Sequence, residues 1–127
     1  MDDARTTGSI RVFFLDDDAD AREPFAEFLR MDDFQVDEFE SAEDALRSIE
    51  RAQPRVMVMD ITLQSGIDGY EAARRIRASD PTRAVRLVAM TGHSAAAVRS
   101  QGDLFDAILT KPVNPSHLVE LVKRLSQ

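Results

Sequence analysis

Residues 10–18 read IRVFFLDDD, an almost continuous apolar run that ends abruptly in three aspartates. Such a run is typical of a strand buried on both faces, because the usual alternation with polar residues is missing. A second run of this kind, Val56 to Met59, follows the break at Pro54 and ends at Asp60. Strands of this type occur in parallel sheets that helices cover on both sides. The two runs therefore predict a parallel sheet.

The rest of the chain alternates between short apolar runs and amphipathic stretches. After the first run, for example, Phe25, Phe28 and Leu29 recur at helical spacing. Strands are predicted at 10–15, 34–39, 56–59, 85–90 and 107–109. Helices are predicted at 19–31, 41–49, 70–77, 94–99 and 118–125. This order predicts the α/β class, with a doubly wound five-stranded parallel sheet and helices on both of its faces.

The composition narrows the classes of function. A chain of 127 residues with 43% hydrophobic content suits one domain, which we expect at 10–127 after a polar, flexible lead at 1–9. The formal net charge of −7 argues against direct binding to nucleic acid. The lack of cysteine excludes disulfides and thiolate metal sites, and a cytoplasmic location is expected. We expect neither a secretory signal nor a membrane span, because no run of about 18 apolar residues occurs.

Polar side chains stand where four of the predicted strands end. They are Asp16 and Asp17 after the first strand, Asp60 after the third, Thr91 after the fourth and Lys111 after the fifth. Ligands of open parallel sheets gather outside the carboxyl ends of the strands, so we expect these residues to meet there. Three crowded carboxylates need a cation to stay ionised together, and Mg²⁺ is the natural choice for oxygen ligands. The set also suits phosphoryl transfer to a carboxylate, with the metal, ammonium and hydroxyl sharing the charge on the phosphoryl oxygens.

This ordered set resembles the receiver domain of response regulators in bacterial two-component signal transduction, as found in chemotaxis regulators. The matching motifs are VFFLDDD at 12–18, DITLQSGIDG at 60–69, MTG at 90–92 and KP at 111–112. The resemblance covers residues 10–126 and implies the flavodoxin-like strand order 2-1-3-4-5. It also implies a self-phosphorylating and self-dephosphorylating signalling switch rather than an enzyme that turns over an external substrate.

The resemblance further assigns roles to individual residues. It implies that Asp60 accepts a phosphoryl group from phosphohistidine, and that Thr91 and Lys111 contact this group. The implied Mg²⁺ ligands are Asp16, Asp17, Asp60 and the backbone carbonyl of Thr62. The implied donor is a histidine kinase or histidine phosphotransfer protein that docks near the first helix and the loop after Lys111. The downstream protein is not written in the sequence, and whether phosphorylation produces a homodimer stays open.

The chain departs from the commonest family pattern at several positions. Gln64 stands where a proline is usual, and Ile108 stands where many members carry a Tyr or Phe that rotates inward on activation. The alanine-rich stretch 94–102 predicts a short fourth helix. We therefore expect output to depend on reordering of residues 92–105 rather than on an aromatic rotation. The resemblance also suggests a cis bond before Pro112.

Three other functions are open at this point. A phosphatase of the haloacid-dehalogenase type would use Asp16 and Asp18 as nucleophile and general acid, but it leaves Asp60 without a role and lacks an acidic pair after Lys111. A pseudo-receiver that docks without accepting phosphate would usually have lost part of the acidic set or the lysine. A flavodoxin-like cofactor binder would need a glycine-rich phosphate loop after the first strand, which is absent. Helix capping is the simpler role for Asp18 and Asp68.

Overall fold

The computed structural model describes residues 10–127, and the lead predicted at 1–9 lies outside the described residues. Five parallel strands form one sheet in the order β2-β1-β3-β4-β5. The strands are β1 (Arg11–Leu15), β2 (Gln35–Phe39), β3 (Val56–Asp60), β4 (Arg86–Thr91) and β5 (Ala107–Thr110). The helices are α1 (Ala19–Met31), α2 (Ala42–Ala52), α3 (Gly69–Ala78), α4 (Ala95–Arg99) and α5 (Pro115–Leu125). The predicted fold class and strand order are confirmed.

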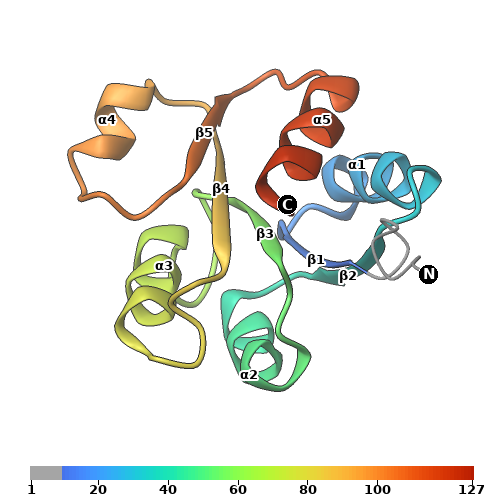
Figure 1. Cartoon of the computed structure of the whole chain (residues 1–127). Helices are drawn as coiled ribbons and strands as arrows, with labels where there is room; N and C mark the ends of the chain where they lie inside the picture. The colour runs from blue at the N-terminus through green and yellow to red at the C-terminus, as the bar shows by residue number, and fades with distance from the viewer. Residues whose placement is uncertain (1–9) are drawn as a thin grey trace.

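Helices cover the sheet on both faces. Figure 1 shows α1 and α5 together on one side of the strands, and α2 and α3 on the other. Alternate residues of β1 serve the two layers, because Val12 and Phe14 pack with the α1–α5 layer while Phe13 and Leu15 pack with the α2–α3 layer. All four side chains are fully buried. This two-sided burial explains why β1 reads as a continuous apolar run.

A side-chain oxygen caps the start of every helix. The N-cap residues are Asp18, Ser41, Asp68, Ser94 and Asn114. Each oxygen accepts a hydrogen bond from a backbone N–H of the first turn, which would otherwise lack a partner. The capping roles predicted for Asp18 and Asp68 are confirmed. Four of these helices begin within five residues of the preceding strand, whereas the longer loop 61–68 separates β3 from α3.

The fourth helix is the exception to the regular pattern. It has only five residues, as the alanine-rich sequence predicted, and residues 100–106 add no further helix or strand. Its one buried side chain, Val98, packs in a small cluster with Ala89 of β4 and Ile61. Among residues 10–127, no helix combines the length and apolar character needed to cross a membrane.

Candidate functional site

The predicted site residues meet at the carboxyl edge of the sheet. Asp60 and Thr91 are the last residues of β3 and β4, whereas Asp16 and Lys111 come directly after β1 and β5. The chain moves outward from β1 to β2 on one side and to β3 on the other, so strand order reverses between β1 and β3. Such a reversal leaves a crevice between the two loops that follow the strands. The acidic side chains lie at this reversal.

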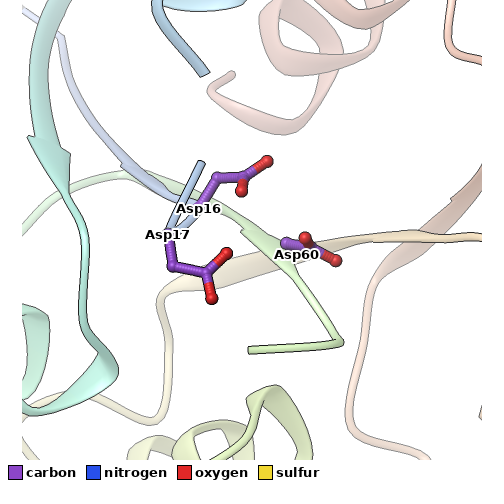
Figure 2. A group of neighbouring side chains, drawn as sticks. All are labelled: Asp16, Asp17 and Asp60. Atoms are coloured by element: carbon purple, nitrogen blue, oxygen red, sulfur yellow. The ribbon is translucent and has the colours of Figure 1, made fainter. Parts of the chain in front are cut away.

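Three carboxylates gather in the crevice. Figure 2 shows Asp16, Asp17 and Asp60 as neighbouring side chains, and one oxygen of each lies within 4.8 Å of the others. In the part of the chain that the structure describes, this is the single group of three or more acidic, His or Cys side chains that could hold a metal. Asp16 and Asp60 are only 4% and 7% exposed. The charges are therefore close together and poorly solvated.

The environment of Asp16 opposes its ionisation. Burial raises the pKa of this carboxyl, and the neighbouring carboxylates of Asp60 and Asp17 raise it further. The Asp18 N–H, which donates to Asp16 Oδ1 over 2.9 Å, and the ammonium of Lys111 lower the pKa but do not outweigh burial. A hard divalent cation would remove this conflict, because it supplies charge to all three oxygens at once. The donor set therefore fits Mg²⁺.

A lysine and a threonine complete the site around Asp60. Lys111 Nζ lies 3.3 Å from Asp60 Oδ2, and Asp60 Oδ1 accepts a hydrogen bond of 3.1 Å from the Thr62 N–H. Thr91 is fully buried, and its Oγ1 accepts a hydrogen bond of 2.9 Å from the His93 N–H, which leaves its own proton free to donate. Thus an ammonium lies beside the carboxylate of Asp60, and Thr91 ends the neighbouring strand β4. A role for the Thr91 hydroxyl stays a prediction. The predicted cis bond between Lys111 and Pro112 is also present.

Thr62 joins the site by its backbone. Its side chain is exposed, and its N–H is bound to Asp60. Metal binding by its carbonyl stays a prediction.

The loop that follows Asp60 is tied to the acidic residues. The Gln64 N–H donates to Asp17 Oδ2 over 2.7 Å, a bond that the usual proline could not make. The Ile67 N–H donates to Glu43 Oε2 over 2.9 Å, and this bond holds the pKa of Glu43 below its ordinary value. Gly66 has a φ of +74°, and a Cβ there would run into the carboxylate of Glu43. No sequence pattern points to Glu43, because its contact is made across 24 positions of the chain.

Arg22 is a second residue that the sequence analysis overlooked. It is only 6% exposed, and its guanidinium donates to the backbone carbonyl of Asp16 over 2.6 Å. A signal was present, because Arg22 precedes the buried Ala26 and Leu29 by four and seven residues and so lies on the apolar stripe of α1. An arginine on such a stripe must find polar partners inside the fold.

Comparison with known proteins agrees with this geometry. The family model for the response regulator receiver domain matches residues 12–123. The chain belongs to the response regulator receiver family. This membership favours the receiver interpretation over the phosphatase of the haloacid-dehalogenase type. The side chain of Asp18, the general acid of that alternative, is engaged as the α1 cap, where it accepts from the Asp20 N–H over 3.0 Å.

Relatives of this receiver domain differ in length. An uncharacterized 14.6 kDa protein in the sodA1 3′ region of Leptolyngbya boryana is 30% identical, over 94% of this chain and 92% of the relative. The C4-dicarboxylate transport transcriptional regulatory protein DctD of Rhizobium meliloti is 31% identical, but the match covers 91% of this chain and only 25% of DctD. For the transcriptional regulatory protein ResD of Bacillus subtilis, 49% of the relative is covered. The chain thus spans half or less of these regulators.

Solved structures with the same fold include receivers from distant organisms. A response regulator receiver domain protein (CheY-like) from Methanospirillum hungatei superposes with a TM-score of 0.81 at 25% identity, covering 92% of this chain and 93% of that one. A putative response regulator from Chloroflexus aurantiacus gives 0.83 at 29% identity, covering 92% and 97%. The architecture around the acidic crevice is therefore that of known receivers.

Proposed function

We propose that this receiver domain is a phosphorylation switch whose acceptor is Asp60. The observation that carries the proposal is the arrangement around this one carboxylate. An ammonium lies 3.3 Å away, and two further carboxylates lie within 4.8 Å of it. A lone structural ion pair between Asp60 and Lys111 would not require Asp16 and Asp17, whose charges make the site less stable. A cation and an incoming anion, by contrast, use every member of the set.

In this proposal Asp60 acts as the nucleophile. One of its carboxylate oxygens forms a bond to phosphorus while the bond from phosphorus to the histidine nitrogen breaks, and the departing imidazole takes up a proton from solvent. The Thr62 N–H and Lys111 hold the two oxygens of Asp60 before the reaction. Lys111 then follows the negative charge onto the phosphoryl oxygens, to which the Thr91 hydroxyl would also donate.

Asp16, Asp17 and Asp60 would hold Mg²⁺, with the Thr62 carbonyl as the further predicted ligand. When bound, Mg²⁺ neutralises the charge on the transferred phosphoryl group. The chain's own contribution is to keep three oxygens close enough to share one ion. The same residues account for slow self-dephosphorylation, because they stabilise a similar charge when water attacks the aspartyl phosphate.

The donor would be a histidine kinase or a histidine phosphotransfer protein. A hollow of about 240 Å³ opens beside the site, between α1 and the loop after β5. Its lining includes Asp16 and Lys111 together with the apolar side chains of Phe25, Met90 and Val113. A partner helix that carries phosphohistidine needs apolar contact next to the reactive group, and this hollow offers it. A cytoplasmic location follows from the need to meet such a donor.

The product of the reaction would be a changed surface for a downstream protein. We expect the change in residues 92–105, because α4 is a single short turn and Ile108 cannot act as an aromatic switch. Phosphorylation could also favour a homodimer, which would be a second form of output. Neither form requires an external substrate.

Intact-mass measurement with acetyl phosphate tests the proposal. We expect one phosphoryl adduct on the wild-type protein with Mg²⁺, and none with EDTA. The adduct should be absent from Asp60→Asn and strongly reduced in Asp16→Asn. Asp33→Asn is the matched control, because Asp33 is exposed and its φ of +72° suits asparagine equally well. This variant should react like the wild type.

Other outcomes would favour the alternatives. A wild-type protein that forms neither an adduct nor a beryllium fluoride complex would be a pseudo-receiver that only docks. An adduct that survives Asp60→Asn and disappears in Asp16→Asn would point to the phosphatase chemistry.

A further inference from the structure

The peptide between Asp16 and Asp17 lies beyond the hydrogen-bonding ladder of the sheet. β1 ends at Leu15, so the two aspartates stand on the first residues of a loop. The Asp16 N–H still donates to the carbonyl of Phe39 in β2, over 3.1 Å. The Asp16 carbonyl instead accepts from the Nη1 of Arg22, over 2.6 Å. The side chain of Arg22 thus supplies the donor that a neighbouring strand would otherwise provide, at the residue where the acidic group begins.

Arg22 is held in place by a second charge. Its Nε donates to Glu38 Oε1 over 2.8 Å, and the side chains of Arg22 and Glu38 are only 7% and 20% exposed. The other oxygen of Glu38 accepts from Arg30 over 2.9 Å. Burial alone would raise the pKa of Glu38, but the hydrogen bonds from Arg22 and Arg30 outweigh it and lower the pKa. Glu38 therefore stays ionised and fixes the guanidinium of Arg22.

The orientation of the Asp16–Asp17 peptide controls two carboxylates at once. Asp16 Oδ1 is fixed by the Asp18 N–H, and Asp17 Oδ2 by the Gln64 N–H. The two accepting side chains belong to the residues on either side of this one peptide. A rotation of the peptide would move the oxygens apart or together, and metal affinity depends on distances to within about 0.2 Å. The bond from Arg22 restrains that rotation.

We propose that Arg22 is a positioning residue for the metal site, acting on Asp16 and Asp17 through the backbone, with Glu38 as its support. The inference rests on the proposed function only in taking the ion to be the one used at Asp60. The hydrogen bonds of Arg22 go to Glu38 and to the Asp16 carbonyl rather than to the three carboxylates, so the proposed effect acts through the geometry of the backbone. Partners of metal ligands are known to set affinity in this way.

Binding of Mn²⁺, followed by the loss of its free EPR signal, provides the test. Mn²⁺ takes the same oxygen ligands as Mg²⁺ and needs no phosphodonor. We expect Arg22→Met to weaken Mn²⁺ binding by about tenfold. Arg22→Lys should recover part of this loss, because one ammonium can reach the carbonyl but cannot also hold Glu38 in the same geometry.

Two controls separate positioning from general destabilisation. Arg30→Met removes the outer arginine of the same Glu38 without touching Asp16, and it should change the affinity by less than about twofold. Val122→Ala removes fully buried core volume in α5 away from the crevice, and should lower stability while leaving Mn²⁺ affinity unchanged. Faster amide exchange at residues 16–18 in Arg22→Met, but not in Arg30→Met, should accompany the loss of affinity.

The possible failures are distinct. If Arg22→Met binds Mn²⁺ as well as Arg30→Met does, the positioning role is wrong, although Asp60 can still be phosphorylated. If the wild-type protein binds Mn²⁺ but forms no adduct at Asp60, the proposed function fails while the role of Arg22 is still measurable. If affinity falls equally in Arg22→Met and Val122→Ala, the effect is one of stability and the inference is overturned.

Discussion

The carboxyl edge of the sheet is built differently on its two sides. On the β1–β3 side, residues 12–15 and 56–59 are fully buried, and the loop 61–68 is fastened by hydrogen bonds to Asp17, Glu43 and Asp60. On the β4–β5 side, α4 has five residues and the strand β5 is at best half-buried. The apolar cluster there contains only three buried residues, Ile61, Ala89 and Val98. The three carboxylates thus lie on the firmly packed side, whereas Thr91 and Lys111 stand at the strand ends of the other side. The segment 92–105 between them has little packing and is free to reorganise at low cost.

On the β4–β5 side, the segment just before β5 is held by hydrogen bonds to charged side chains. Asp106 accepts from the Leu87 N–H and from Arg77, both over 2.8 Å, and Arg77 also donates to the carbonyl of Leu104 over 2.9 Å. Phe105 adds an edge contact with Tyr70, at 6.4 Å between ring centroids. Hydrogen bonds of this kind can be exchanged for bonds to water with little loss of free energy, whereas exposing a buried ring to water costs much more.

The largest expected difference between the two sides is in stability. Phe14→Ala should lower the free energy of unfolding by about 3–5 kcal/mol, because a fully buried ring is lost from the core. Phe105→Ala should lower it by only about 1 kcal/mol, because its ring is partly exposed and lies at the edge of two apolar clusters rather than inside the core. Urea denaturation of both variants measures the contrast. Equal losses would show that the β4–β5 side is as firmly packed as the core.

The second prediction concerns which side moves when the switch is set. Beryllium fluoride with Mg²⁺ should change amide hydrogen exchange in residues 92–105 by about tenfold. Exchange in residues 12–15 and 56–58 should stay nearly constant, since these segments are fully buried in both layers. Asp60→Asn, measured with the same additives, should show no change in the hydrogen exchange of residues 92–105. A response spread evenly over the sheet would contradict the division into two sides.

The smallest effects are expected in the pH dependence of stability. The pKa of Asp16 on one side is raised and that of Asp106 on the other is lowered, so the two groups change stability with pH in opposite directions. The pKa of Asp16 is raised by burial and by its acidic neighbours, so the folded protein holds this proton more tightly than the unfolded chain. Stability should therefore fall as the pH rises from the ordinary 3.8 through the raised pKa. Asp16→Asn should remove this fall, and saturating Mg²⁺ should remove it in the wild type. Urea midpoints measured in EDTA across this range test it.

Asp106 should act in the reverse direction. Burial would raise its pKa, but the hydrogen bonds from Leu87 and Arg77 prevail and lower it, so its contribution is lost as the pH falls below the ordinary 3.8. Asp106→Asn should be about 1 kcal/mol less stable than the wild type at pH 7, since solvent screens this partly exposed group. The deficit should shrink in acid. If the stability deficit of Asp106→Asn is the same at pH 3 and pH 7, the charge of Asp106 is not what stabilises the segment before β5.

Most of the fold follows from local sequence patterns. Apolar runs, together with the alternation at 34–39, place every strand to within one residue of its observed bounds, and the polar ends of the runs identify the acidic crevice. The roles of Arg22, Glu43 and Asp106 could not be read in this way. Their partners lie on other elements, and a polar side chain that reaches across the fold leaves no periodic trace. The family resemblance indicates that Gln64 stands where a proline is usual, but not that its N–H binds Asp17.

That bond at Gln64 has a consequence for protein engineering. Restoring the residue most common among relatives is a general route to higher stability, and proline also restricts the unfolded chain. Here the replacement would delete the donor that binds Asp17 Oδ2 over 2.7 Å, and would leave this half-buried carboxylate to find another partner. The entropic gain is thus set against the loss of a charge-assisted hydrogen bond. A consensus redesign of this domain should therefore keep glutamine at position 64.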